Sequence, residues 1–477
     1  MKMNSGCRKL RTGRSEVESF LVVSTPKSNP NLLHFEHRRL LRIEHVYKTT
    51  QLKVHGLLYT LVRKGLVMDA ILERCAGLDV HQETIVACVM FGPLDKRAKK
   101  EIRTFGTTTK ELLQLQDWLA EYNCTDVAME STGVYWKPVW NILEGSFHLW
   151  LANPQRIKNV PGRKTDMKDA VWIAQLLRCG LIEASFVPPE DIRDLRDLSR
   201  YRRKLLGDAT AEKNRVHRIL QDANIKLTTY VSDIFGVSGR ALLESLVNGE
   251  VLEPHEVERI VKTQLKRKVP QLIDALNGRI RFHHRKMIQK HLKHLEYLEK
   301  EIEVLESDIA QLLSPYQEAV DLLVTIPGIQ KDAAAGILAE IGCDMSMFPS
   351  EGHLASWAGV SPGNNESAGK KKSTRTRNGN KGLKSILCQA AWAAAKAKNS
   401  RLSSFYHRLV KRRGPKKANM AVSHLLLRII YQMLLRNQPY SELGWDYLPK
   451  KEKSLEYWVQ RIKTLGYNVV QLQPEIT

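Results

Sequence analysis

Apolar and polar positions alternate most clearly between residues 76 and 178 of the chain. Short apolar runs bounded by turn residues predict strands, and apolar residues three or four positions apart predict helices. We therefore expect an α/β domain in which three strands are followed by alternating helices and strands. The expected elements are a hairpin at 76–91, an extended run at 101–105, a helix at 109–122, a strand at 125–130, a helix at 134–144, a strand at 148–152 and a helix at 165–178.

After residue 190 the pattern becomes helical, with apolar steps of three or four residues separated by Glu and Lys. We expect long helices at 191–221 and 285–313, with a smaller helical insert rich in Arg and Lys at 225–284. Such spacing is typical of a coiled-coil seam. Both an antiparallel hairpin within one chain and an interface between two chains satisfy it. The seam positions of the second helix are Ile288, Leu292, Leu295, Leu298, Ile302, Leu305, Ile309 and Leu312.

Residues 323–338 resemble a helix-hairpin-helix. In such motifs the hairpin exposes backbone N–H groups, and the next helix adds its positive N-terminal end. These hairpins hold DNA phosphates without reading sequence, so Gly328 is a candidate contact. Gln330 stands where many of these motifs have a second glycine. The other helices expected in this half are one at about 383–398 and two across 401–437, of which 420–435 is apolar enough for a core.

A polar, Gly-rich loop is expected at 354–387, between two apolar elements. Flexible backbone with clustered cations suits close contact with phosphates. Ser367 is one hydroxyl among several in this loop, and Ser361 and Ser373 compete with it as a candidate nucleophile. The candidate nucleic-acid contacts in the loop are Lys370, Lys371, Lys372, Arg375 and Arg377.

Four carboxylates in the α/β segment occur where a metal-dependent nuclease needs them. Asp79 lies on the first expected strand, and Glu130 ends a later one. Asp166 and Asp169 are three residues apart and therefore share a face of the last expected helix. Mg²⁺ prefers hard oxygen ligands, and two such ions roughly 4 Å apart serve phosphodiester cleavage. We predict that the four acids bind Mg²⁺, with two ions per site.

A basic loop runs from Asn153 to Lys168 and leads into the helix with the two acids. A cationic loop beside metal ligands suits a phosphate backbone that enters the site. Arg163 and Lys164 are the candidate contacts, and a solvated surface loop is the alternative.

The formal net charge of +23 over 477 residues favours a polyanionic partner, for which nucleic acid is the first candidate. Residues 1–67 show no clean periodicity. They are either a basic arm for nucleic acid or an extension outside the fold, and we favour the extension.

The seven cysteines include no C-x-x-C pair and give no zinc or disulfide framework. No apolar run reaches the roughly 18 residues of a membrane span, and no signal peptide is recognisable. We expect a cytoplasmic protein without a membrane partner.

The four acids are followed much later in the chain by Pro-Gly-Asn-Asn-Glu-Ser-Ala-Gly-Lys and Arg-Asn-Gly-Asn-Lys-Gly-Leu-Lys. This combination resembles the DEDD transposases of bacterial insertion sequences, the IS110 type, which are bridge-RNA-guided recombinases. The resemblance covers about 70–447. The order of the N-terminal elements also resembles the ribonuclease H or Holliday-junction-resolvase fold.

The resemblance implies a resolvase-like metal domain at 68–185, a coiled-coil region at 190–315 and a mostly helical transposase domain at 320–447, followed by a tail at 448–477. It implies that the coiled coil helps to assemble dimers into tetramers of a nucleoid-associated bacterial protein.

The resemblance also implies that Ser367 attacks DNA at a Mg²⁺-assisted composite site and forms a covalent 5′-phosphoserine link. Ala368 stands where many members have the glycine that follows this serine. A structured guide RNA from the element would pair with both donor and target DNA.

Two other functions fit the residues. One is a metal-dependent, structure-specific nuclease of the junction-resolvase kind, in which water is the nucleophile and Ser367 is dispensable. The other is a non-enzymatic RNA-binding or packaging protein whose acids only stabilise the fold. The presence of all four acids argues against the non-enzymatic function.

Overall fold

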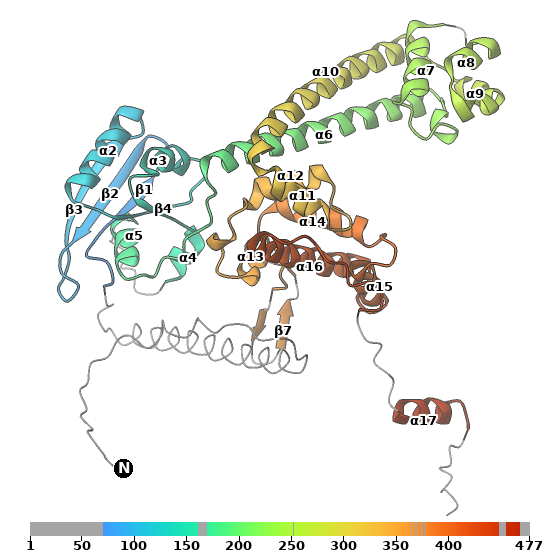
Figure 1. The fold of residues 1–477 in the computed structure, drawn as a ribbon. Helices are drawn as coiled ribbons and strands as arrows, with labels where there is room; N and C mark the ends of the chain where they lie inside the picture. Colours follow the sequence, from blue (N-terminus) through green and yellow to red (C-terminus); the bar gives the residue numbers. More distant parts are fainter. Residues whose placement is uncertain are drawn as a thin grey trace, which may run out of the picture. The chain divides into compact units, whose positions relative to one another are not determined.

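The computed structural model describes residues 70–160, 169–250, 252–363, 365–367, 370–373, 375–376, 378–447 and 455–467. The chain divides into two compact units, Met1–Ser185 and Phe186–Thr477 (Figure 1). The extension predicted at 1–67 lies outside the described residues, as do Arg163, Lys164, Asp166 and Arg377.

The first unit is built on a mixed five-stranded sheet with the order β3-β2-β1-β4-β5. The hairpin partners β1 and β2 are antiparallel, as are β2 and β3, whereas β1, β4 and β5 are parallel. The predicted succession of three strands and then alternating helices and strands is confirmed. The strands are β1 (Arg74–Val80), β2 (Thr84–Phe91), β3 (Lys99–Gly106), β4 (Asp126–Glu130) and β5 (His148–Ala152).

Helices cover both faces of this sheet. On one face Cys75 and Ala128 share a buried cluster with α5. On the other face the Phe105 ring of β3 packs on Trp118 of α2, with ring centroids 5.5 Å apart. The strands β1, β2 and β4 are therefore mostly buried on both sides, which explains their nearly continuous apolar character, whereas the edge strand β3 is polar and mostly exposed. The helices are α2 (Thr109–Glu121), α3 (Trp136–Leu143), α4 (Pro154–Asn159) and α5 (Asp169–Arg178).

The helix α4 corrects one expectation, because the stretch between the strand expected at 148–152 and the helix expected at 165–178 was expected to be a loop. The Asn153 side chain accepts a hydrogen bond from the Gln155 N–H, and Pro154 occupies the first helical turn. An Asn cap followed by proline is a helix-start signal. The helix is only six residues long, too short to show an apolar period.

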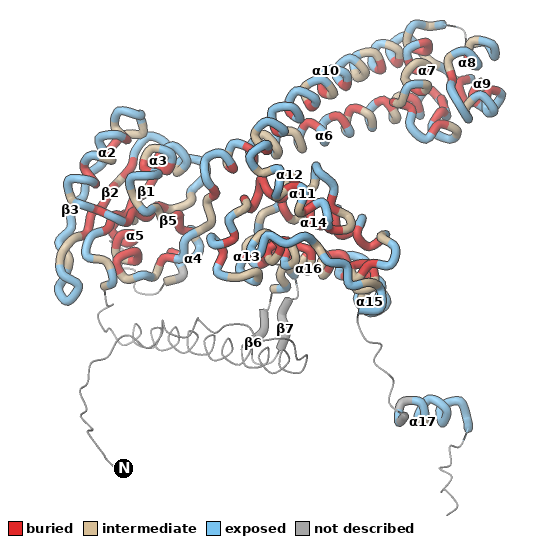
Figure 2. The backbone as a smooth tube through the Cα atoms, viewed as in Figure 1, coloured by how far each residue is buried: buried red, intermediate tan, exposed pale blue. Residues whose placement is uncertain are grey.

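Two long antiparallel helices, α6 (Glu190–Asp222) and α10 (Phe282–Leu313), run through the second unit. Arg202 near the start of α6 pairs with Glu306 near the end of α10, and Asp222 at the end of α6 pairs with His284. The helices therefore pair within one chain, which is one of the two arrangements that the heptad pattern allowed. Their facing sides are buried (Figure 2). Coiled-coil geometry and pairing between chains stay predictions.

The insert between these helices packs on one end of the pair (Figure 1). Buried residues of the insert, such as Leu242 and Leu272, share a cluster with Leu220 of α6 and Ile288 of α10. The predicted helical character of the insert is confirmed. Its helices are α7 (Val237–Asn248), α8 (Pro254–Ile260) and α9 (Val269–Leu276).

The other end of the pair joins a helical body around α16 (Pro415–Arg436). By length and composition α16 could cross a membrane, but its Val422, Leu426 and Ile430 are fully buried in the core of this unit. The expected core helix is confirmed. The other helices are α11 (Gln317–Val324), α12 (Lys331–Ile341), α13 (Glu351–Trp357), α14 (Lys381–Ala394), α15 (Arg401–Arg413) and α17 (Leu455–Thr464).

The segment expected to be a polar loop contains a small hairpin. Strands β6 (Asn365–Ser367) and β7 (Lys370–Ser373) pair in antiparallel register, with Ser367 opposite Lys370. This hairpin and α13, which extends to Trp357, correct the expectation of a loop at 354–387, whereas α14 begins at Lys381, close to the helix start expected at about 383. Strands are predicted from apolar alternation, which this polar segment lacks.

Candidate active site

Asp79 and Glu130 lie at the carboxyl ends of neighbouring parallel strands. The register pairs Leu78 of β1 with Met129 of β4, so the next residues along the two strands are Asp79 and Glu130. Register partners in adjacent strands project to the same side of a sheet. The two carboxylates therefore lie side by side on one face.

This face is the one that α5 covers. A Cβ atom on Gly77 would come within 2.3 Å of the Ala174 backbone nitrogen and 2.4 Å of the Ala170 carbonyl oxygen. The α5 backbone therefore passes directly over β1 at Gly77, which only glycine permits. Asp79 is two residues further along the strand and projects to this side.

The direction of α5 brings Asp169 to the same end as Asp79. At the end of α5 the Arg178 carbonyl accepts a hydrogen bond from the Ile71 N–H, and the Arg178 guanidinium donates to the Glu73 carbonyl. Ile71 and Glu73 precede β1, so α5 runs back along the strand. Its first residue, Asp169, therefore lies toward the carboxyl end of β1.

Three of the four predicted acids are thus brought to one end and one face of the sheet, and Asp166 lies outside the described residues. The Asp79 side chain is 23% exposed and has His81 Nε2 3.3 Å from its Oδ2. Glu130 is half-buried, and Thr132 Oγ1 donates to its Oε1 at 3.0 Å. Partly open carboxylates of this kind are hard oxygen donors and fit a divalent cation such as Mg²⁺.

Asp126, at the opposite end of β4, has a different environment. It is buried and accepts hydrogen bonds from Trp150 Nε1 at 2.9 Å and Thr125 Oγ1 at 2.8 Å, and His148 Nδ1 lies 2.9 Å away. Burial raises its pKa, but these hydrogen bonds outweigh burial and hold the pKa of Asp126 below its usual value. A carboxylate with this many protein donors is structural.

The structure describes the backbone of Ser367 and of Lys370, Lys371 and Lys372 in the β6–β7 hairpin, whereas their side chains lie outside the described residues. Arg375 follows the hairpin and is exposed. The candidate serine therefore lies in a short paired strand opposite a basic one. Its role as nucleophile and the phosphate contacts of these cations stay predictions.

Gly328, the candidate contact of the hairpin between α11 and α12, also has a packing role. Its φ of +92° favours glycine, and a Cβ there would come within 2.5 Å of the Ala394 nitrogen in α14. Sequence reasoning gave no sign of this contact. A phosphate contact through the neighbouring backbone stays a prediction.

A buried ion pair that the sequence did not reveal anchors the start of α14. Glu340 of α12 is 2% exposed and accepts two hydrogen bonds from the Arg200 guanidinium, at 2.9 and 2.8 Å. Asn380, which caps α14, donates to Glu340 Oε2 at 2.6 Å. Burial lowers the pKa of the neighbouring Arg196 to about 10, although Glu340 opposes this effect. The signal that the sequence offered for this ion pair was the spacing of Arg196 and Arg200, which are four residues apart on α6 and therefore share a face.

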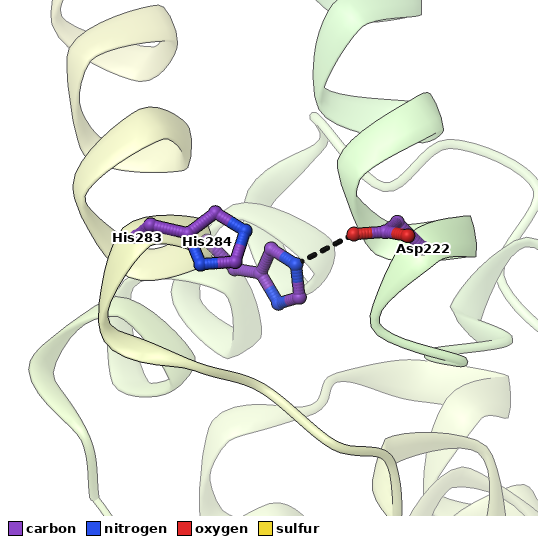
Figure 3. Close-up of side chains that lie close together, drawn as sticks. All are labelled: Asp222, His283 and His284. Carbon is purple, nitrogen blue, oxygen red and sulfur yellow. Dashed lines mark hydrogen bonds and ion pairs between the residues drawn. The ribbon is translucent and has the colours of Figure 1, made fainter.

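A second group of potential metal ligands, Asp222, His283 and His284, lies where α6 ends and α10 begins (Figure 3). His284 Nε2 is 2.7 Å from Asp222 Oδ2. The Arg281 guanidinium lies 3.5 Å from the same Oδ2 and 3.3 Å from His284 Nε2. A positive charge at this place repels a metal cation. We therefore infer that these residues hold the end of α6 against the start of α10.

Two family models match the chain. Residues 76–225 match a transposase model of the DEDD, IS110 type, and residues 320–407 match the model of the transposase IS116/IS110/IS902 family. The pilin gene-inverting proteins of Moraxella bovis and Moraxella lacunata are each 33% identical to this chain over 144 residues. That match is 29% of this chain and spans 44% of each relative.

Among solved structures, Thermus thermophilus RuvC and the same protein in complex with a Holliday junction substrate match 24% of this chain. The match covers 99% and 100% of those chains, at 14% identity and a TM-score of 0.19. This score is too low to carry a conclusion on fold or function.

Proposed function

Because this chain belongs to the IS110-type transposase family, we propose that it is a DNA recombinase that cuts and rejoins DNA strands during transposition. The observation that carries the proposal is the convergence of Asp79, Glu130 and Asp169 at one end and one face of a sheet. Partly exposed acids gathered in this way suit phosphodiester chemistry better than stability.

The proposed metal ligands are Asp79, Glu130 and Asp169, joined by Asp166. Divalent ions, two Mg²⁺ in our proposal, would neutralise the phosphate and lower the pKa of the attacking hydroxyl when bound. The chain's own part is to hold the four carboxylates in place. Glu130 is fixed by Thr132, and the contact of α5 with Gly77 fixes the helix that carries Asp169.

The proposed nucleophile is Ser367. Its Oγ forms a bond to phosphorus as the bond from phosphorus to the 3′-oxygen breaks, and the serine proton passes to solvent while the 3′-oxygen gains one. The product is a 5′-phosphoserine link and a free 3′-hydroxyl. Attack by another 3′-hydroxyl reverses the step, so strands are exchanged without ATP. The basic strand β7 beside Ser367 supports an approaching phosphate.

The proposed partners are donor and target DNA and a structured guide RNA from the element. The formal net charge of +23 supports polyanionic partners. We further propose a dimer or tetramer, in which Ser367 acts at the acids in a composite site. The chain spans less than half the length of its curated relatives, so their activity is carried over only as part of this proposal.

A covalent-adduct assay tests the mechanism. Protein, guide RNA, Mg²⁺ and labelled donor and target DNA are resolved on a denaturing gel. We expect a DNA-shifted protein band that falls about a thousandfold or more in both Ser367→Ala and Asp79→Ala, because each removes a group required in the transition state.

The matched controls are Ser441→Ala and Asp117→Ala, which remove an exposed serine and an exposed acid and should leave the band unchanged. Cleaved DNA without an adduct, at the same level in Ser367→Ala, would instead identify a nuclease that uses water. No cleavage by any variant, with DNA still bound, would favour a non-enzymatic protein.

A further inference from the structure

A cavity of about 800 Å³ lies in the second unit, between the end of α14, the start of α15 and the segment that follows α16. Aromatic side chains line much of it. They are Trp392 from α14, Tyr406 and His407 from α15, and Trp445. None of these residues takes part in the proposed strand exchange.

The rings form a connected series. The Trp392 and Tyr406 centroids are 5.6 Å apart, those of Tyr406 and His407 5.4 Å, and those of His407 and Trp445 5.9 Å. The inner ring, Tyr406, is buried, whereas Trp392 is 44% exposed and Trp445 is 45% exposed. Two tryptophans at the cavity therefore keep ring surface available to a ligand, which is unusual for so large an apolar side chain.

The segment that carries Trp445 is held against α15. Glu442 accepts a hydrogen bond from the Arg401 N–H at 2.8 Å and from the Gly444 N–H at 2.9 Å. The Arg401 guanidinium lies over the Tyr447 ring, 4.4 Å from its centroid. These contacts on both sides of Trp445 keep this wall of the cavity in place before a ligand arrives.

The polar lining of the cavity is cationic. Lys396, Lys398 and Asn399 are exposed and line it, and the described residues of its lining include no carboxylate. Lysines beside the aromatic faces disfavour a cationic ligand and favour an anion. A ligand that is flat, aromatic and negatively charged fits both the exposed rings and the lysines of the cavity. A nucleotide has all three properties.

We propose that this aromatic cavity binds an unpaired base of a single-stranded nucleic acid. The base stacks on Trp392 or Trp445, while Lys396 and Lys398 contact the phosphates beside it. Stacking on aromatic side chains is how proteins hold bases that are not in a duplex. The inference rests on the proposed function only in taking nucleic acid as the partner.

The test measures binding of the full-length protein to a short single-stranded RNA, the DNA of the same sequence and the corresponding duplex. Fluorescence anisotropy in EDTA keeps strand cleavage out of the readout. We expect Trp392→Ala and Trp445→Ala each to weaken single-strand binding about five- to tenfold and to leave duplex binding unchanged. A loss confined to one strand type identifies whether RNA or DNA supplies the base.

The controls separate stacking from general damage. Trp392→Phe keeps an aromatic face and should retain most of the affinity, and Trp458→Ala removes a tryptophan of similar exposure on α17 and should have no effect. The double variant Lys396→Ala/Lys398→Ala should reduce the salt dependence of single-strand binding by about 1.4 units of slope, about 0.7 for each lysine. Unchanged single-strand affinity in both tryptophan variants, or equal losses for the duplex, overturns the proposal.

Photocrosslinking gives a measurement that needs no variant. A strand substituted with 5-iodouridine is irradiated with the unmodified protein, and the attachment sites are read by mass spectrometry. We expect attachment at Trp392, Tyr406 or Trp445, and attachment only elsewhere overturns the inference. A normal covalent adduct without these crosslinks would overturn the proposal for the aromatic cavity and leave the recombinase mechanism in place. Crosslinks without any covalent adduct would overturn the recombinase mechanism and leave the proposal for the aromatic cavity in place.

Discussion

Asp79 and Asp126 are two carboxylates of the same sheet that have different roles. Asp126 is surrounded by donors from Thr125, His148 and Trp150, which leave it little capacity for a further ligand. Among the described residues, His81 is the close polar neighbour of Asp79, whose side chain is 23% exposed. Partly exposed carboxylates are characteristic of sites that bind a cation.

Gly77 is the residue on which the placement of Asp169 depends. In Gly77→Ala the new methyl group would press on the α5 backbone at Ala170 and Ala174, which cannot yield as a side chain can. We expect a loss of about 3 kcal/mol in the free energy of unfolding of the first unit, from overpacking.

The measurement is chemical denaturation, with Gly207→Ala as control. Gly207 is exposed on α6 and a Cβ there meets nothing within 4 Å, so alanine should be neutral or stabilising by up to about 1 kcal/mol. Wild-type stability of Gly77→Ala would mean that α5 does not lie on β1 as described.

At the scale of elements, the sequence predicted most strands of the first unit because they are short apolar runs ended by a turn. The end positions of Asp79 and Glu130 could be predicted in the same way. Their register could not, because it depends on which strands pair, and a single sequence does not show pairing. The contact of α5 with Gly77 was equally hidden, since an isolated glycine in a strand has several explanations.

The elements that were missed are short or polar. The helix α4 and the strands β6 and β7 form through a cap and backbone pairing rather than through an apolar period. Glu340 was missed for another reason. A glutamate between apolar helix residues looks solvated until the arginines of a distant helix are known to face it.

The pair α6–α10 carries a buried carboxylate that makes its stability depend on pH. Glu212 is 4% exposed; His291 Nδ1 lies 2.6 Å from its Oε2 and His294 Nδ1 3.0 Å from its Oε1, and Arg215 contacts it from the same helix. Burial raises the pKa of Glu212, but these partners lower it more, so the pKa lies below its usual value.

A lowered pKa means that Glu212 contributes stability above its unfolded pKa and loses this contribution as pH falls through its folded pKa. We expect Glu212→Gln to cost about 2 kcal/mol near neutral pH, the size of hydrogen bonds to a charged group. The difference should shrink as pH falls below about 4. Denaturant titrations of both proteins across pH check this, with exposed Glu303→Gln on α10 as control. A cost independent of pH would contradict the role of the charge.

At the scale of the whole molecule, the division at Ser185 separates two units that each have a hydrophobic core. Domains with their own cores commonly unfold as separate cooperative units. The carboxylates proposed to bind metal lie in the first unit and Ser367 lies in the second. The chemistry proposed for this chain therefore uses residues of both units, and we expect the two units to unfold independently.

Calorimetry of the full chain tests this independence. We expect two thermal transitions, of which Gly77→Ala lowers one and Glu212→Gln the other, because the two substitutions disturb different cores. The double variant should show both shifts, each within about 0.5 kcal/mol of its single-variant value. A single transition lowered by both substitutions would mean that the units fold as one body. In that case a loss of adduct in a destabilised variant could arise in either unit, and only a substitution that leaves stability unchanged would report on the chemistry alone.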